Sequence, residues 1–273
     1  MAKALIMDVT RCNGCFNCQI ACKDEYVEND WPPYSLAQPD TGHLWMKTQE
    51  IVRGTVPKVK VAYVAQPCMQ CDNAPCLKAA TGGAIYKRDD GIVIIDPVKS
   101  VGQKQLVASC PYGAIYWNEQ LGTPQKCTFC AHLLDRGWKE PRCVESCPVG
   151  ALMFGEYEDL KKTIEAKGAV ALHPEYGAQP RVYYIGLPKT FIAGALVDSS
   201  TGECLEGADV SAKDTATGKT TATKSDIFGD FWLDGLDAGT YTVTISKSGM
   251  KSTSMQVSLQ KSTNLGDIEL SPL

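Results

Sequence analysis

Thirteen cysteines carry most of the chemical information in this 273-residue chain, because their spacing is regular. The first four, between Cys12 and Cys22, have the spacing C-x2-C-x2-C-x3-C. Three thiolates at such intervals wrap one [4Fe–4S] cube, and the fourth points away to ligate another cube. Zinc is the alternative metal, but this run would crowd the four ligands that a zinc ion takes. The motif therefore predicts iron–sulfur clusters.

The last cysteine group, residues 127–147, has the spacing C-x2-C-x12-C-x3-C, with a stretched middle. Taken alone, this spacing also suits zinc. Beside the first motif the cluster interpretation is better, because two-cluster ferredoxins exchange the fourth cysteines of their motifs. The exchange predicts two ligand sets, which we call set A (Cys12, Cys15, Cys18 and Cys147) and set B (Cys22, Cys127, Cys130 and Cys143).

The two middle groups are incomplete in a complementary way. CMQCDNAPC (68–76) has three cysteines, and Ala80 stands where a fourth would follow. Cys110 opens CPYGA, the usual end of a cluster motif, but the three cysteines that should precede it are absent. By the same exchange Cys110 completes the earlier group, although a lone cysteine is commonly just a buried structural residue. We call this group set C (Cys68, Cys71, Cys76 and Cys110).

The positions without cysteine are equally regular. They are the four ligands of one further complete cluster: Ala80, Ser100, Gln103 and Leu106. The sequence thus predicts three [4Fe–4S] clusters and the loss of a whole fourth one.

We expect no role in chemistry for the remaining cysteine or for the three histidines. Cys204 has no ligand-spaced neighbour, and His43, His132 and His173 fit no ligand spacing. The chain has no glycine-rich nucleotide loop, no nucleophile with a base and no obvious carboxylate pair. We therefore expect no catalytic residue on this chain.

Charge and hydropathy exclude several partners. The net charge of −4 gives no electrostatic reason to expect nucleic acid or an anionic membrane. No apolar run approaches twenty residues, so no membrane span is expected. The N-terminal residues resemble neither a signal peptide nor a twin-arginine signal. We therefore expect a cytoplasmic chain, unless it is exported in complex with a partner that carries the signal. In such a chain dense cysteines indicate metal rather than disulfides.

The chain divides into three segments, and the first of them holds all the predicted ligands. Residues 1–155, with an insertion at 23–67, hold all the predicted ligands between short apolar runs such as GIVIID (91–96), which suits a fold held by clusters. Residues 156–189 form a connector: EYEDLKKTIEAKG predicts a short amphipathic helix, and the proline-rich remainder is expected to run extended over the surface. A loop as long as the insertion is usually functional or lies against a partner.

Residues 190–273 are rich in threonine, serine and glycine and alternate between polar and apolar positions. About seven short strands separated by turn signals predict an all-β sandwich. The pattern resembles the carboxypeptidase-regulatory or transthyretin-like sandwich family, which implies a fold but no function. The expected class is α+β: ferredoxin-like double-cluster domains followed by an immunoglobulin- or transthyretin-like sandwich.

The cysteine groups, in this order and with the stretched last one, resemble the electron-transfer subunits of the DMSO reductase family of molybdenum and tungsten enzymes. That resemblance covers residues 1–185, including PRVYY (180–184). The lost cluster and the added sandwich resemble the small subunits of pyrogallol–phloroglucinol transhydroxylase and resorcinol hydroxylase. Further stretches support this likeness: GHLWMK (42–47), QPCMQCDNAPC (66–76), GIVIIDP (91–97) and CPYGAIYWNE (110–119).

The resemblance implies a heterodimer whose large subunit holds molybdenum or tungsten in two pterin guanine dinucleotides and binds a polyphenol. This chain would then pass single electrons to or from that metal. Two alternatives remain: the electron-transfer subunit of another family member, such as a catechol dehydroxylase or a thiosulfate or polysulfide reductase, and a stand-alone ferredoxin-like carrier.

Overall fold

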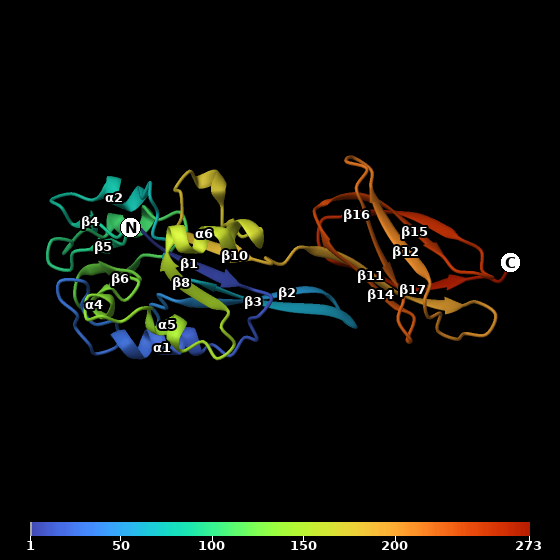
Figure 1. Ribbon diagram of the computed structural model, residues 1–273, viewed down its shortest axis with the longest axis horizontal. Helices are drawn as coiled ribbons and strands as arrows, with labels where there is room; N and C mark the ends of the chain where they lie inside the picture. Colours follow the sequence, from blue (N-terminus) through green and yellow to red (C-terminus); the bar gives the residue numbers. More distant parts are fainter. Residues whose placement is uncertain (1) are drawn as a thin grey trace. The chain divides into compact units, whose positions relative to one another are not determined.

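The computed structural model describes residues 2–273, which divide into two compact units (Figure 1). Unit 1 comprises Met1–Glu50 and Ala62–Leu187, and unit 2 comprises Ile51–Val61 and Pro188–Leu273. The hairpin of β2 (Lys47–Thr55) and β3 (Lys58–Gln66) supplies residues to both units. The insertion expected as one long loop at 23–67 therefore ends in a β-hairpin over residues 47–66.

Unit 1 is built on a four-stranded sheet in the order β8-β1-β10-β9, in which β1 pairs parallel to β10 and antiparallel to β8. Its strands are β1 (Lys3–Asp8), β8 (Leu152–Glu156), β9 (Val170–Ala171) and β10 (Val182–Ile185). The apolar run ALIM makes β1 a fully buried strand, as parallel pairing favours. The predicted amphipathic helix exists as α6 (Tyr157–Ala166) and packs on β1 and β8.

The proline-rich segment after α6 differs from expectation at its end. Residues 173–177 are exposed, as expected, but Val182 and Tyr184 are fully buried in the sheet. The pairing of β10 with β1 satisfies the backbone of this segment and covers its apolar side chains. A short 3-10 helix, η1 (Pro174–Tyr176), precedes it.

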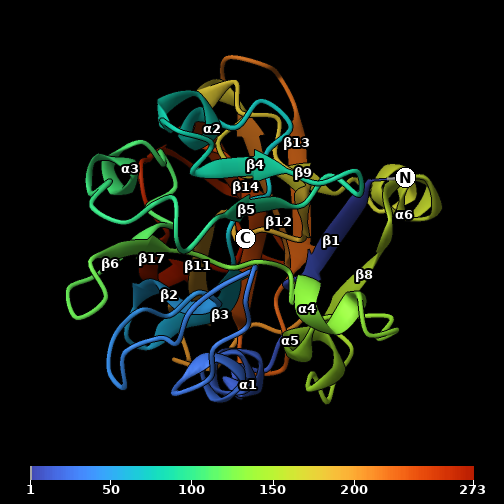
Figure 2. The same cartoon turned by 90° about the vertical axis from the view of Figure 1, so that its left-hand side faces the viewer.

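The cysteine-bearing part of unit 1 consists of short elements joined by turns (Figure 2). Its hairpins are β4 (Ile85–Lys87) with β5 (Val93–Ile95), and β6 (Tyr116–Asn118) with β7 (Thr123–Gln125). Its helices are α1 (Asn17–Tyr26), α2 (Pro75–Ala79), α3 (Gln105–Ala108), α4 (Ala131–Leu134) and α5 (Arg142–Glu145). Helices α1 and α5 lie side by side, as do α2 and α3. Segments this short cannot build a large hydrocarbon core of their own.

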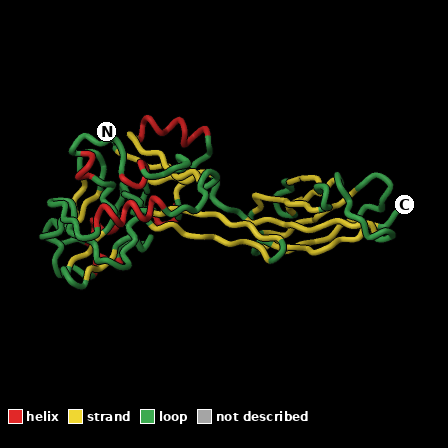
Figure 3. Tube along the Cα trace, turned by 90° about the horizontal axis from the view of Figure 1, so that it is seen from below, coloured by secondary structure: helices red, strands yellow, loops and turns green. Residues whose placement is uncertain are grey.

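Residues 188–273 form the predicted seven-stranded sandwich of unit 2, seen as yellow strands in Figure 3. One sheet has the order β14-β11-β17 and the other β13-β12-β15-β16. The strands are β11 (Thr190–Asp198), β12 (Asp209–Asp214), β13 (Thr220–Lys224), β14 (Asp230–Leu236), β15 (Gly239–Ser246), β16 (Thr253–Leu259) and β17 (Thr263–Leu270). Alternate residues such as Tyr241, Val243 and Ile245 fill the space between the sheets.

Within residues 2–273 no helix has the length and apolar composition that crossing a membrane requires.

Candidate metal centres

The four cysteines of set C line one small cavity, although Cys110 lies 34 positions beyond Cys76 in the sequence. Cys68, Cys71 and Cys76 are each less than 10% exposed. The rest of the lining is almost entirely apolar. Tertiary folding therefore gathers four thiols around one enclosed space, and Cys110 is among them.

Set A lines a second small cavity, which Phe16 and Val149 help to line. Cys12 and Cys15 lie in the loop before α1, Cys18 lies in the first turn of α1, and Cys147 lies in the turn that follows α5. Cys15 is exposed and the other three members are partly buried. Set A therefore lies nearest to the protein surface.

Set B is buried throughout, since its members are each 8% exposed or less. Burial, followed by the neighbouring thiols Cys127 and Cys130, raises the pKa of Cys22 well above its usual value. Burial and the same two cysteines, with Cys22, likewise raise the pKa of Cys143. Cys22 and Cys143 therefore each lie close to Cys127 and Cys130, in the region where α1 packs on α5.

Set B also lies between the other two sets. Cys18 of set A is close enough to contribute to the raised pKa of Cys22 and of Cys143. On the other side, burial and then Cys68 of set C raise the pKa of Cys127 to about 12. The spatial order of the thiol sets is therefore A, B, C.

The donor sets fit iron–sulfur cubes better than single ions. Across residues 2–273, no three His, Cys, Asp or Glu side chains converge closely enough to hold one metal ion, whereas sets A and C each surround a cavity. Burial raises the pKa of Cys71 to about 12 and that of Cys76 to about 11, so these thiols stay protonated at neutral pH unless a cation displaces the proton. A thiophilic, multi-iron group fits both observations.

The two closing motifs, CPYGA (110–114) and CPVGA (147–151), form the same turn. The Ala114 N–H donates to the Cys110 Sγ at 3.4 Å, and the Ala151 N–H donates to the Cys147 Sγ at 3.2 Å. The glycine before each alanine has a positive φ, which favours glycine. Because hydrogen bonds to sulfur tune a cluster, both turns prepare their cysteine for the same task.

Comparison with known proteins agrees with this geometry. Residues 59–157 match a 4Fe-4S dicluster domain, and residues 192–271 match a carboxypeptidase regulatory-like domain. The chain is 43% identical to the pyrogallol hydroxytransferase small subunit of Pelobacter acidigallici over 97% of its own length and 98% of the relative's. The chain belongs to this family.

More distant relatives share the cluster-bearing part. A tetrathionate reductase subunit of Salmonella typhimurium is 34% identical over 69% of this chain and 74% of its own. The arsenate respiratory reductase iron-sulfur subunit of a Shewanella is 29% identical over 68% of this chain and 96% of its own. This member of the pyrogallol hydroxytransferase small-subunit family is an electron-transfer subunit of a larger enzyme.

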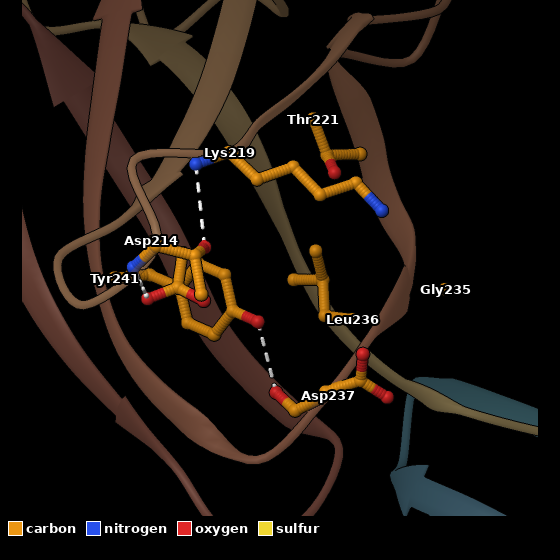
Figure 4. Close-up of a pocket in the computed structure, with 8 residues that line it drawn as sticks. Asp214, Lys219, Thr221, Gly235, Leu236, Asp237 and Tyr241 are labelled. Atoms are coloured by element: carbon orange, nitrogen blue, oxygen red, sulfur yellow. Dashed lines mark hydrogen bonds between the residues drawn. The ribbon is translucent and has the colours of Figure 1, made fainter.

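The sandwich of this family member resembles solved structures only weakly. A Klebsiella pneumoniae 5-hydroxyisourate hydrolase covers 31% of this chain and 91% of its own at 19% identity, with a TM-score of 0.26, too low to support an argument. Figure 4 shows an open hollow of unit 2 that Asp214, Lys219 and Tyr241 help to line. The Tyr241 hydroxyl donates to the Asp237 carbonyl at 2.9 Å. No cysteine lines this hollow, and its residues suggest no redox chemistry.

A buried polar network joins sets B and C, and sequence reasoning missed it. The Cys127 carbonyl accepts hydrogen bonds from Gln70 Nε2 at 2.9 Å and from Lys126 Nζ at 3.1 Å. Gln70 Oε1 in turn accepts from the Val93 N–H at 2.8 Å, and Lys126 Nζ donates to the Val93 carbonyl. The available signal was the lysine directly before the cysteine in QKCTFC, whose side chain is 2% exposed in the structure.

The residues without an expected role have other partners. His132 Nε2 lies 2.9 Å from Glu25 Oε1, and its ring stacks on Trp31 with centroids 4.4 Å apart. Cys204 is exposed on the sandwich.

The positions of the missing cluster are now filled by ordinary packing. Leu106 and Ser100 are fully buried, and the Ser100 and Thr123 hydroxyls lie 2.8 Å apart. Gln103 is hydrogen-bonded to the backbone of Thr81, the residue after Ala80. Hydrogen bonds and an apolar side chain thus occupy the region where four thiols would be needed.

Proposed function

We propose that sets A, B and C each hold one [4Fe–4S] cluster, and that the chain passes single electrons to or from a molybdenum or tungsten bis-pterin centre in a large partner subunit. When bound, the clusters supply reversible one-electron redox chemistry. The observation that carries the proposal is the gathering of twelve thiols into three groups of four, with the membership that the exchange of fourth cysteines requires.

The protein's own residues give the three sites different environments. Set B is sealed from water by α1 and α5, whereas the exposure of Cys15 leaves set A in reach of solvent or a partner. Amide N–H groups donate to sulfur in each set: Ala114 in set C, Ala151 in set A and Phe129, whose N–H lies 3.4 Å from the Cys127 Sγ, in set B. Burial and these hydrogen bonds are the means by which a protein adjusts cluster potentials.

The order of the sets supports an electron path through A, B and C. The positions of the missing fourth cluster adjoin set C, since Leu106 and Cys76 lie in the neighbouring helices α3 and α2. The lost cluster would therefore have been terminal. A path shortened at one end suits a reaction without net electron flow better than a fast respiratory chain.

We infer from this that the complex acts on polyphenols, by moving a hydroxyl between pyrogallol-type rings without net oxidation. The relative named pyrogallol hydroxytransferase small subunit supports the substrate class. Resorcinol-type ring hydroxylation, with electrons passed to a soluble acceptor, is the second candidate. Another oxidoreductase of the tetrathionate or arsenate reductase type is the third, because those relatives share the cluster region. We further propose a cytoplasmic location, where unpaired thiols are kept reduced.

Two measurements test the proposal. Iron and acid-labile sulfide analysis of the anaerobically purified complex should give about 12 irons per small subunit, as three four-iron clusters require. Stoichiometric zinc or a fourth cluster would reject it.

The reaction is tested by assaying pyrogallol and resorcinol with and without a dye acceptor. Conversion of pyrogallol without the acceptor supports hydroxyl transfer, and acceptor-dependent resorcinol oxidation supports the second candidate. Comparable rates with tetrathionate or arsenate would reject both.

A further inference from the structure

Lys126 is buried in an unusual way. Only two lysines in the described part of the chain are buried, and Lys126 is 2% exposed. The other, Lys58, forms an ion pair with Asp230. Lys126 donates only to the carbonyls of Val93 and Cys127, and no carboxylate among residues 2–273 pairs with it. Its positive charge therefore has no anionic partner among the protein's carboxylates.

Burying such a charge is costly, because carbonyl dipoles replace only part of the hydration of an ammonium group. An unpaired buried charge is normally compensated by an ion of opposite sign nearby. The only candidates around Lys126 are cysteines. Lys126 lines the cavity of set C, and its backbone precedes Cys127 of set B.

The ammonium acts on the thiols of that cavity. Burial raises the pKa of Cys71, Cys76 and Cys110, and the charge of Lys126 opposes this rise at each of them. The same charge also opposes the rise at Cys127 of set B. Because Lys126 lines the cavity of set C, its charge favours negative charge in that cavity.

A [4Fe–4S] cube with four thiolate ligands is an anion, and one-electron reduction adds one more negative charge without breaking a bond. A fixed cation beside the cube therefore stabilises the reduced form more than the oxidised form. In a site with little water the effect is screened much less than on the surface.

We propose that Lys126 is the counter-ion of the cluster held by set C and raises its reduction potential above the value it would have without this charge. The proposal rests on the proposed function, in that it requires a cluster at set C. An electron that arrives from the cluster of set B is then retained at set C. Set C is the last site of the path, because the fourth cluster that would follow it is missing. Lys126 acts on the cluster through its charge and contacts no substrate.

The test is an EPR-monitored redox titration of the anaerobically purified complex. Lys126→Gln removes the charge but keeps an N–H donor for the carbonyls, and Lys126→Arg keeps the charge. Lys162→Gln, an exposed position of α6, is the matched control for the loss of one positive charge. The signal of set C is the one that Cys110→Ala alters.

We expect Lys126→Gln to lower the equilibrium constant for one-electron reduction of the set C cluster at least tenfold, which corresponds to a fall of about 59 mV in its reduction potential. Set A should be unchanged, and both Lys126→Arg and Lys162→Gln should stay within about threefold of the original protein. An unchanged set C potential in an iron-loaded Lys126→Gln complex would overturn the proposal.

Iron content separates the remaining outcomes. If Lys126→Gln loses the set C cluster while Lys126→Arg keeps it, the charge is what holds the anion, and the proposal stands. If both variants lose the cluster, the position serves packing alone and the proposal fails. Fewer than three clusters in the unaltered complex would instead reject the proposed function, before any variant is compared.

Discussion

The side chain of Gln103 holds the backbone of Thr81 by two hydrogen bonds, since Oε1 accepts from the Thr81 N–H and Nε2 donates to the Thr81 carbonyl, each at 3.2 Å. Nε2 also donates to the Lys99 carbonyl at 3.0 Å. Gln103 stands where a ligand of the missing cluster would lie. A side chain thus ties together loops that iron would otherwise join.

We predict that Gln103→Ala destabilises this region without loss of iron. The lost hydrogen bonds are partly exposed and together stabilise the fold by about 1–2 kcal/mol. Faster hydrogen exchange in residues 80–104, with three clusters retained, would be the expected result. The control is Gln105→Ala, because Gln105 is exposed and lies two positions away. Loss of iron in Gln103→Ala would show that the residue supports a cluster directly.

Cys110 and Cys204 should respond to substitution in opposite ways. Cys110→Ala removes one of four thiols from the set C cavity, so that cluster should be lost or should shed one iron. Cys204→Ser changes an exposed thiol on the sandwich and should leave iron content and EPR spectrum intact. Equal iron content in the two variants would remove Cys110 from set C.

A chain that ends at Leu187 should keep its clusters. All twelve cysteines of sets A, B and C belong to unit 1, so their assembly does not require the sandwich. The hairpin tip Ile51–Val61 belongs to unit 2 and would lose its packing, which should lower solubility. Iron analysis and size-exclusion chromatography of the shortened chain check both statements. Loss of all clusters would contradict the first.

Gly54→Ala should destabilise unit 2. Gly54 has a φ of 89°, and an added Cβ would come within 2.6 Å of the Phe191 ring and 2.2 Å of the Lys58 carbonyl. Strain and overpacking together should cost about 2–4 kcal/mol. Gly42→Ala is the matched control, because its φ is also positive but nothing lies within 4 Å of an added Cβ. Thermal unfolding of the two variants should therefore differ, and equal midpoints would refute the close packing.

Asp135→Asn should weaken unit 1 by a nearly constant amount from pH 8 down to about pH 5. Hydrogen bonds from Arg88, at 2.7 and 2.8 Å, lower the pKa of Asp135 to about 2. Because the pKa of Asp135 is lower in the folded chain than in the unfolded chain, where it is about 3.9, the ionised carboxylate stabilises the fold at any pH above that value. This contribution is lost as the pH falls from about 3.9 through about 2.

The expected penalty is about 1 kcal/mol or less, because the Asp135 side chain is 40% exposed and solvent screens the pair. It should shrink in high salt. Asp89→Asn, at an exposed neighbouring position, should have no comparable effect on the unfolding midpoint. A penalty that vanished already near pH 6 would contradict the lowered pKa.

The sequence predicts the membership of the thiol sets because cluster ligation would impose it locally. The intervals between cysteines decide which thiols can reach one cube, and the exchange of fourth cysteines leaves Cys110 as the partner of Cys68, Cys71 and Cys76. Strand alternation likewise predicted the sandwich, since each strand must place every second side chain in the core.

Tertiary structure alone decided the order of the sets, the burial of β10 and the burial of Lys126. None of these follows from spacing, because each depends on which distant segments pack together: β10 on β1, α1 on α5, and the Cys68 loop on Cys127. A lysine in a sequence is normally a solvated charge. It becomes a buried cation only when folding removes water from around it and leaves thiols as the nearest groups able to carry negative charge.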